Sequence, residues 1–336
     1  MSPHTPEEIV SSIRDIGTLP QSMAAILEIL DDPNSDASDI GDIISRDVSL
    51  TARMLKMVNS VQYSRSRKVS KISEAVMVMG LNSVKVLALS SSLFSIKPDE
   101  ELFGSLNIKR IWRHFIETAS CARSIAESIA FKNTEDAFVA GVMHDIGIVA
   151  MILFFREKYF DAIKMMKENK TGVVAVEKEM FGMTHCEVGV AMAKDWKLPS
   201  GVSFVVENHH SIDPPLIVPE DSMLCNIVSL ADRIALGPFE YYHASIEEDI
   251  RDIKTLCGRM KLSTADANRI RKASLLQSII LSEHLELDTG EVMEVLTVAN
   301  SRLADMYLSL EKIIRERDQL LNEAEKIIKE STPNPV

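Results

Sequence analysis

Apolar residues recur at spacings of three and four along most of the chain, a pattern typical of amphipathic α-helices. In the first hundred residues the spacing is clear over residues 23–30 and again over residues 48–58. The polar stretch 31–36 between them and Asp47 are typical helix-start signals. Alternation with a period of two, bounded by turn residues, does not occur, so no strand is expected. The sequence therefore predicts an all-α fold.

A second series of helices is predicted after the polar break at residues 97–100. Within it, Thr184 followed by Glu187 matches a capping box, which places His185 in the first turn of its helix. Gly, Pro or Asn separates neighbouring members of the series, as expected for a helical bundle. The expected helices cover residues 111–129, 136–144, 148–167, 184–196, 199–210 and 222–236.

At 336 residues the chain is longer than one compact core usually holds, so more than one helical unit is expected. After Gly290 the apolar residues follow the three-four alternation of a coiled coil, and Arg317 interrupts its register. The predicted organisation is two helical lobes followed by a coiled-coil-like helix and a disordered tail. These parts cover residues 1–98, 99–289, 290–330 and 331–336, respectively.

The net charge of −12, from 37 basic and 49 acidic residues, argues against nucleic acid and anionic membranes as partners. A basic cluster at residues 65–71 is more typical of a solvated loop than of a binding groove. The first twenty residues do not resemble a signal peptide, and no stretch of about 18 uncharged apolar residues occurs. A cytoplasmic protein is therefore expected. The cysteines are widely spaced without a CxxC pair, which predicts reduced thiols in the core.

Histidines and aspartates gather at the ends and faces of the predicted helices. The pair His144-Asp145 ends the apolar helix AFVAGVMHDIG, and Gly147 is expected to permit a sharp turn that directs both side chains into one pocket. Imidazole and carboxylate suit Fe, Mn, Zn or Ni, whereas a soft metal would have recruited the cysteines. Alternatively, each ring is a separate core or helix-end histidine. The candidate metal ligands are His114, His144, Asp145, His185, His209, His210 and Asp232, while His4, His243 and His284 receive no role.

The order of His114, His144-Asp145 and the later Asp232 resembles that of the HD phosphohydrolase superfamily. The stretches LPQSMAAILEILDDPNSDASDIGDIISRDVSLTARMLKMVNS and KISEAVMVMGLNSVKVLALS are similar to the HDOD domain, a regulatory relative of that superfamily. The resemblance continues through WRHFIETA, FVAGVMHDIG, THCEVGVAMAKDWKLP, ENHH and LADRIA and covers roughly residues 10 to 240. It implies a bacterial signalling or scaffolding module, a group that has typically lost its catalytic residues.

The chain departs from that description because it keeps His185, the pair His209-His210 and Asp232. In this it resembles the HD-GYP phosphodiesterases, and the set is sufficient for two divalent metals bridged by Asp145, with iron the first choice. However, the stretch HHSIDPPLIVP stands where HD-GYP enzymes carry an acidic residue and a Gly-Tyr-Pro turn that help to bind cyclic dinucleotides. The resemblance therefore favours a metal site more than that substrate.

Two functions follow from this interpretation. The leading one is a regulatory HDOD module with a metal-binding pocket, which binds a signalling protein or self-associates through its C-terminal helix. The competing one is a metal-dependent phosphohydrolase acting on a nucleotide or cyclic dinucleotide, in which two cations about 3.5–4 Å apart clamp a phosphate. No catalytic residue is assigned, but Asp145 is the candidate if the site is active. Lys194 and Arg233 are the basic residues considered for phosphate, and both are expected to be surface charges.

Overall fold

The computed structural model describes residues 4–15, 26, 37–59, 69–93, 108–216, 218–235, 237–239, 242–243, 246–284, 317 and 319–321. The helices are α1 (Pro6–Asp15), α3 (Ala37–Arg46), α4 (Val48–Val58), α5 (Ile72–Met79), α6 (Leu81–Leu93), α8 (Ile108–Ser128), α9 (Thr134–Met143), α10 (Ile146–Phe155), α11 (Glu157–Asn169), α12 (Val173–Phe181), α13 (His185–Asp195), α14 (Ser200–Asn208), α15 (Pro219–Ile234), α16 (Ile246–Arg259) and α17 (Thr264–His284). Within these residues no strand occurs, so the all-α prediction is confirmed.

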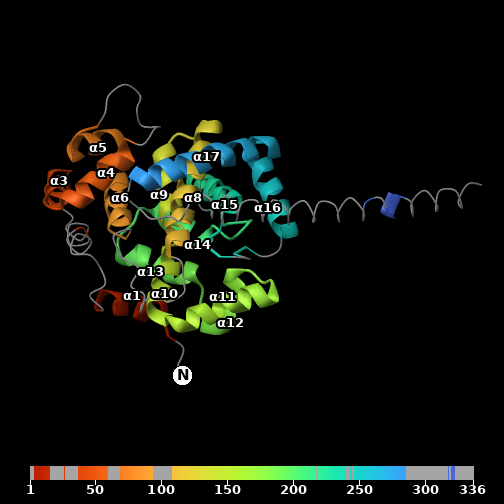
Figure 1. Cartoon of the computed structure of the whole chain (residues 1–336). Helices are drawn as coiled ribbons and strands as arrows, with labels where there is room; N and C mark the ends of the chain where they lie inside the picture. The colour runs from red at the N-terminus through yellow and green to blue at the C-terminus, as the bar shows by residue number, and fades with distance from the viewer. Residues whose placement is uncertain are drawn as a thin grey trace, which may run out of the picture.

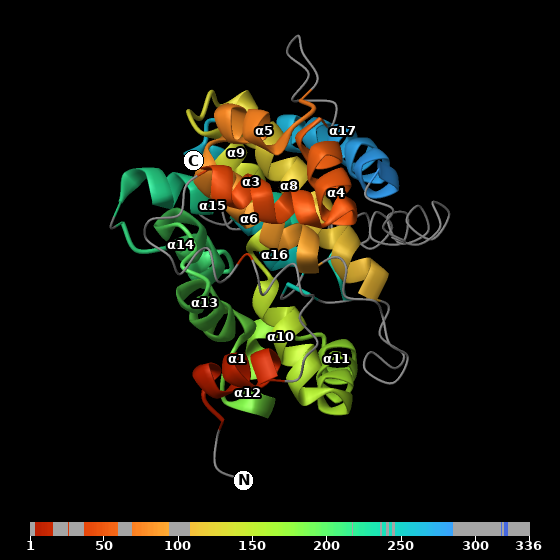
Figure 2. The same ribbon diagram turned by 90° about the vertical axis from the view of Figure 1, so that its left-hand side faces the viewer.

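The short helices α3 to α6 pack against one another at one side of the molecule, and α6 joins this group to α9 (Figure 1). At the opposite end, α1 packs on α10 and α13, close to α11 and α12 (Figure 2). Helix α17 returns across α8 and also contacts α4. The division of the chain into lobes at residue 98 stays a prediction.

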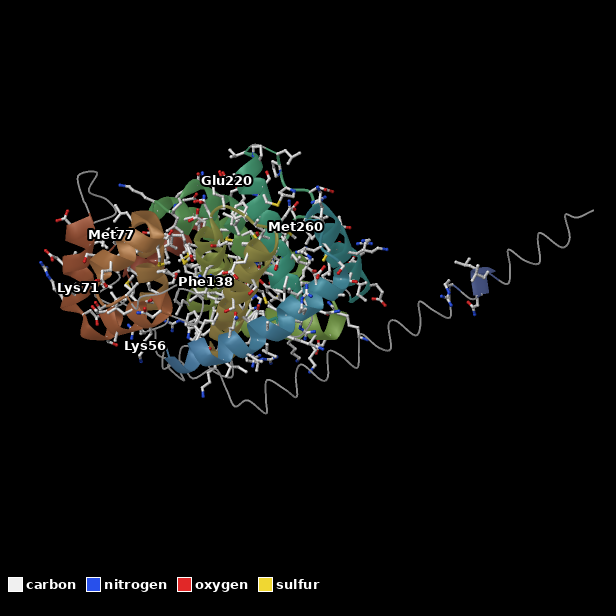
Figure 3. The ribbon with its side chains drawn as sticks, turned by 90° about the horizontal axis from the view of Figure 1, so that it is seen from above. Lys56, Lys71, Met77, Phe138, Glu220 and Met260 are labelled. Carbon is white, nitrogen blue, oxygen red and sulfur yellow. The ribbon has the colours of Figure 1, made fainter. Side chains whose placement is uncertain are left out.

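Helix α8 lies at the centre of this arrangement, between α9, α15 and α17. Small residues let its neighbours approach closely, since a Cβ added at Gly141 of α9 would lie 2.7 Å from Ala119 Cα. Phe138 of α9, 2 % exposed, lies among the helices in Figure 3, whereas Met77 of α5, 79 % exposed, lies at the edge. The close approach brings the middle of α8 beside the end of α9, where His114 and His144 meet.

The single helix predicted over residues 148–167 is wrong, because the chain breaks at Arg156. Arg156 has a φ of 49°, in the left-handed region, and separates α10 from α11. Helix α10 is apolar and buried along most of its length, whereas α11 buries only Tyr159, Ala162 and Met166. The change from a buried to an amphipathic pattern marks the boundary, although no Gly or Pro stands there.

The other helices predicted beyond residue 100 form within a few residues of their expected bounds. The capping box is present: Thr184 Oγ1 accepts from the Glu187 amide, and Glu187 accepts from the Thr184 amide, so α13 begins at His185. Helices α1, α12, α16 and α17 were not anticipated. The predicted helix over residues 23–30 lies almost entirely outside the described residues. The same is true of the coiled-coil-like helix, and the tail lies wholly outside them.

The segment Thr134–Phe155 has a mean hydropathy of 2.1 over a membrane-length window, so its length and composition resemble a membrane span. However, 89 % of that window is buried inside the protein, and Asp145 interrupts the segment. Such burial is consistent with a core element of a soluble protein.

Gly147 does not make the expected sharp turn, since among the described glycines only Gly80 and Gly182 have a positive φ. It lies in the first turn of α10 and permits a close approach to α13. A Cβ there would overlap the His185 carbonyl oxygen and lie 2.8 Å from the Gly189 amide nitrogen.

Gly147→Ala is expected to lower the free energy of unfolding by about 1–3 kcal/mol or more. The atoms that a new Cβ would overlap belong to the backbone of α13, which cannot shift as easily as a side chain. Chemical denaturation measures this change. Gly258→Ala in α16 is the matched control, because a Cβ there meets nothing within 4 Å. The control is expected to be neutral or to stabilise by up to about 1 kcal/mol. Equal stability of the two variants would contradict the assigned close approach.

Candidate metal centre

Six helices and their ends bring the seven predicted ligands together. His114 projects from the first half of α8, and Asp232 from α15. His144 ends α9 and Asp145 precedes α10, while His185 begins α13 and the pair His209-His210 follows α14. Except for His210, which is partly buried, these side chains are fully buried. The candidate set therefore forms one cluster, although its role as a metal site stays a prediction.

Asp145 lies at the centre of the cluster, and its two oxygens face different partners. Oδ2 lies 3.3 Å from His114 Nε2 and 3.1 Å from His144 Nε2. Oδ1 lies 3.4 Å from His185 Nε2 and 3.1 Å from His209 Nε2. One carboxylate therefore stands between two groups of ring nitrogens.

The first group consists of His114, His144, Asp145 and Asp232, whose ligand atoms all lie within 4.8 Å of one another. Asp232 Oδ1 lies 3.2 Å from His114 Nε2 and 3.6 Å from His144 Nε2. Despite these short distances, neither oxygen of Asp232 has a hydrogen bond of acceptable geometry among the described residues. A buried carboxylate left in this way is costly, and a cation would compensate it.

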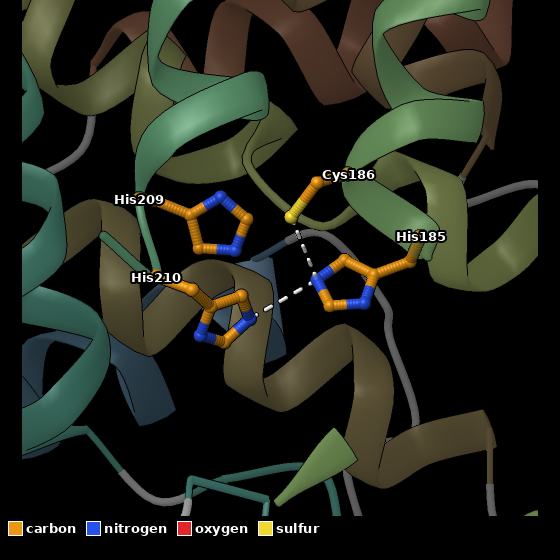
Figure 4. Close-up of side chains that lie close together, drawn as sticks. All are labelled: His185, Cys186, His209 and His210. Carbon is orange, nitrogen blue, oxygen red and sulfur yellow. Dashed lines mark hydrogen bonds between the residues drawn. The ribbon is translucent and has the colours of Figure 1, made fainter. Parts of the chain in front are cut away.

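The second group consists of His185, Cys186, His209 and His210, again with ligand atoms within 4.8 Å of one another. His210 Nε2 lies 3.0 Å from His185 Nε2 (Figure 4). Two ring nitrogens at this distance repel each other if both carry lone pairs, and a shared proton or cation removes that repulsion. The presence of Cys186 was not predicted, since the cysteines were expected to serve only as core thiols.

Hydrogen bonds from the opposite ring nitrogens orient several of these imidazoles. His144 Nδ1 lies 2.8 Å from the Gly141 carbonyl, and His209 Nδ1 lies 3.2 Å from the carbonyls of Val205 and Val206. Because a carbonyl only accepts, Nδ1 carries a proton in both rings, which leaves Nε2 as the ring atom directed into the cluster. Metal-binding histidines are typically held in this way.

Glu177 of α12 orients His185 and was missed by sequence reasoning. Its Oε2 accepts from the backbone amide of His185 at 2.8 Å and lies 2.7 Å from the ring Nδ1, while its Oε1 accepts from the Tyr159 hydroxyl. The side chain is fully buried. A carboxylate on the far side of a ligand ring raises the basicity of that ring toward a metal.

The electrostatics of the cluster suit a cation. Burial opposes ionisation of Asp145 and Asp232. The charge of His144 and hydrogen bonds from the surrounding histidines nevertheless hold the pKa of Asp145 well below normal, and the charge of the nearby His243 holds the pKa of Asp232 well below normal. Burial lowers the pKa of His209 and, more strongly, that of His210, so both rings are neutral. Burial also lowers the pKa of His144, but the Asp145 charge dominates and raises it to about 10. Binding of a cation would therefore release a proton from His144.

Tyr242 and His243 are further members of the cluster that the sequence did not indicate. The Tyr242 hydroxyl donates to Asp145 Oδ2 at 2.5 Å and lies 3.5 Å from His210 Nε2. His243 Nε2 lies 3.5 Å from Asp232 Oδ1, and His210, Asp232 and His243 form a further group of possible ligands. Both residues follow α15 outside any periodic helix, and the only signal in the sequence was a histidine eleven residues after Asp232.

The expectation that Arg233 is a surface charge is wrong. Its guanidinium is buried and donates to the carbonyls of His209 and His210 at 3.2 Å each, and it also lies 3.5 Å from Asp252 Oδ2. Arg233 therefore holds the turn that carries the two histidines. Lys194 is exposed, as expected.

An all-helical chain with a buried histidine and aspartate cluster around an HD pair defines the class of HD-related proteins. The sequence profile of the HDOD domain matches residues 16–212. Because this match covers more than half of the chain, the protein belongs to the HDOD family, as the sequence motifs predicted. Asp232, Tyr242 and His243 lie beyond the matched residues.

The chain also resembles a curated relative and several solved structures. An uncharacterized protein of Treponema pallidum is 27 % identical over 207 residues, which are 61 % of this chain and 39 % of the relative. The chain thus spans about two fifths of the curated relative that it matches.

A Geobacter sulfurreducens HDOD domain protein of unknown function superposes with a TM-score of 0.58 at 24 % identity, covering 83 % of this chain and 97 % of its own. A Shewanella amazonensis protein named as a candidate metal-dependent phosphohydrolase superposes with a TM-score of 0.52 at 21 % identity, covering 80 % and 99 %. At these identities the likeness shows the shared fold.

Glu177→Gln is expected to weaken divalent metal binding by about 10–100-fold, because the glutamine keeps the shape but loses the charge that polarises His185. Titration of the metal-free chain with a divalent cation measures this loss. Tyr159→Phe is the control, since it removes a donor to Glu177 without changing the contacts to His185. Unchanged affinity in Glu177→Gln, or an equal loss in Tyr159→Phe, would contradict the orienting role.

Proposed function

We propose that this protein is a bacterial HDOD regulatory module that acts by associating with another protein. Its buried metal centre would stabilise the fold or sense a signal. The observation that carries the proposal is the position of Tyr242. Its hydroxyl donates to the Asp145 oxygen that faces His114 and His144, in a region where the ligand atoms are buried. A buried phenol that is hydrogen-bonded to this carboxylate restricts access to it, which supports a regulatory role.

The ligands fit two divalent cations that share Asp145. His114, His144 and Asp232 would hold one cation, and the residues around His185 and His210 would hold the other. The unsatisfied oxygens of Asp232 and the oriented rings support this fit. Nitrogen and carboxylate ligands favour iron, with Mn, Zn or Ni as alternatives. Such ions supply Lewis acidity and, in the case of iron, redox chemistry.

The basic residues considered for phosphate binding also support a regulatory role. Arg233 donates to the carbonyls of His209 and His210, and Lys194 is exposed. Phosphoryl transfer depends on positive groups aimed at the developing charge. With Arg233 engaged by these carbonyls and Lys194 at the surface, the metals would have to stabilise that charge without them.

A metal-dependent phosphohydrolase acting on a nucleotide or cyclic dinucleotide is the second candidate. One observation favours it: the oxygens of Asp145 face separate ligand groups, as the bridging carboxylate of a two-metal enzyme does. The candidate name of the similar Shewanella protein agrees with this alternative. In such an enzyme Asp145 would bridge the metals, and Tyr242 would have to move away from it.

Metal analysis of the purified chain, reconstituted with iron or manganese, tests the centre. We expect about two cations per chain, loss of both in Asp145→Asn, and retention of one in Asp232→Asn, because only Asp145 faces both groups. Asp136→Asn is the control, as Asp136 lies on α9 but accepts from Ser83. A reconstituted wild-type chain without metal would contradict both proposed functions.

The same loaded protein is then incubated with phosphoesters, nucleotides and cyclic dinucleotides. No turnover is expected for the regulatory module. Hydrolysis that disappears in Asp145→Asn would instead establish the phosphohydrolase.

Self-association through the C-terminal helix is tested by sedimentation of the full chain. We expect a dimer that Leu303→Asp with Leu310→Asp dissociates, because both leucines belong to the apolar alternation predicted over residues 290–330. Replacement of Glu311 by Gln, outside that alternation, is the control. A monomeric wild-type chain would leave a separate signalling protein as the proposed partner.

A further inference from the structure

We infer that Cys186 supplies a thiolate ligand to the second metal position, which would make that half of the centre selective for a thiolate-tolerant cation such as Zn²⁺, Fe²⁺ or Co²⁺. The inference rests on the proposed metal-binding function and goes beyond it, since it assigns a sulfur ligand and a distinct chemistry to one of the two positions. It concerns the group His185, Cys186, His209 and His210 (Figure 4).

The distances in this group match those expected around a single cation. Cys186 Sγ lies 3.5 Å from His185 Nε2, which in turn lies 3.0 Å from His210 Nε2. In a tetrahedral site with zinc-type bond lengths, neighbouring nitrogen and sulfur ligands are about 3.6 Å apart, and two nitrogens about 3.3 Å apart. Figure 4 shows the sulfur and the rings of His185 and His210 turned toward one another. Small movements of these side chains would complete the coordination.

The position of Cys186 on α13 favours a ligand role. Cys186 is the second residue of α13, so its sulfur lies in the first turn of the helix, beside the ring of His185. Cys186 is 9 % exposed, so solvent competes little for the sulfur. On binding, the thiol proton would pass to solvent and the sulfur lone pair to the cation.

The remaining cysteines lack this setting. Cys121, Cys225 and Cys257 are free and buried, and among the described residues none of them belongs to a candidate ligand group. Burial raises the pKa of Cys225 to about 12, and its sulfur lies 3.9 Å from Ser229 Oγ. Cys225 is therefore a matched control: a buried thiol on α15, the helix that also carries Asp232.

The two halves of the centre would then differ in chemical character. The first group offers two imidazoles and two carboxylates, a set that accepts Fe, Mn, Zn or Ni. The second offers three imidazoles and a thiolate, a softer set that disfavours Mn²⁺. The expectation from sequence that a soft ligand is absent therefore does not hold for this half.

Cobalt substitution tests the assignment because a thiolate bound to Co²⁺ gives a near-ultraviolet charge-transfer band that nitrogen and oxygen ligands do not give. The full chain is stripped with a chelator and titrated anaerobically with Co²⁺, with bound cobalt measured in parallel. We expect the band in the wild-type chain and in Cys225→Ser, and its loss in Cys186→Ser and Cys186→Ala. Affinity at the second position should fall by at least about tenfold, since even outer-shell partners contribute about 10–100-fold.

The outcomes separate this inference from the proposed function. Cobalt bound by the wild-type chain without the band would overturn the thiolate ligand while leaving the metal centre intact. A band that persists in Cys186→Ser would also overturn the assignment. Failure of the wild-type chain to bind cobalt at all would overturn the metal centre itself and the inference with it. Circular dichroism of each variant confirms that the fold is retained.

Discussion

The buried carboxylate of Asp145 is the constraint on which the rest of the site depends. A charge without solvent is costly, and here it is compensated by ring nitrogens from three helix ends and one helix face, together with a tyrosine hydroxyl. Each partner has to arrive at one point from a different part of the chain. The close contact of α8 with α9 and of α10 with α13 meets this requirement, because small residues at Gly141 and Gly147 let the backbones approach.

Much of the fold was predictable because local sequence patterns indicate where the helices begin and end. The apolar spacing of three and four marks the helices, and the Thr184 and Glu187 pair marks the start of α13. That the candidate residues form one cluster was also predictable, because an adjacent His144-Asp145 pair at a helix end is informative by itself. The break at Arg156 was not, since a left-handed residue other than Gly or Asn leaves no compositional signal.

The side chains around the ligands could not be predicted, for a physical reason. Glu177, Cys186, Tyr242 and His243 acquire their roles from what the fold places beside them, not from their own sequence neighbours. Glu177 is one of several carboxylates on α12 and nearby helices, and only its burial distinguishes it. Arg233 was expected at the surface, because an arginine on an amphipathic helix is usually solvated. In the structure it is buried against the turn that carries His209 and His210 and donates to their carbonyls.

The burial of the ligands also determines how quickly the centre could exchange its contents. With six of the predicted ligands at 0 % exposure, an ion held there would have little direct contact with solvent, and its exchange would be favoured by local opening of the helices. Loading would then be slow compared with diffusion and would be set either while the chain folds or during rare openings. A cation once bound would be retained through brief changes in its concentration in the surrounding solution. The cation that is bound would then depend on which metals were available when the chain was synthesised.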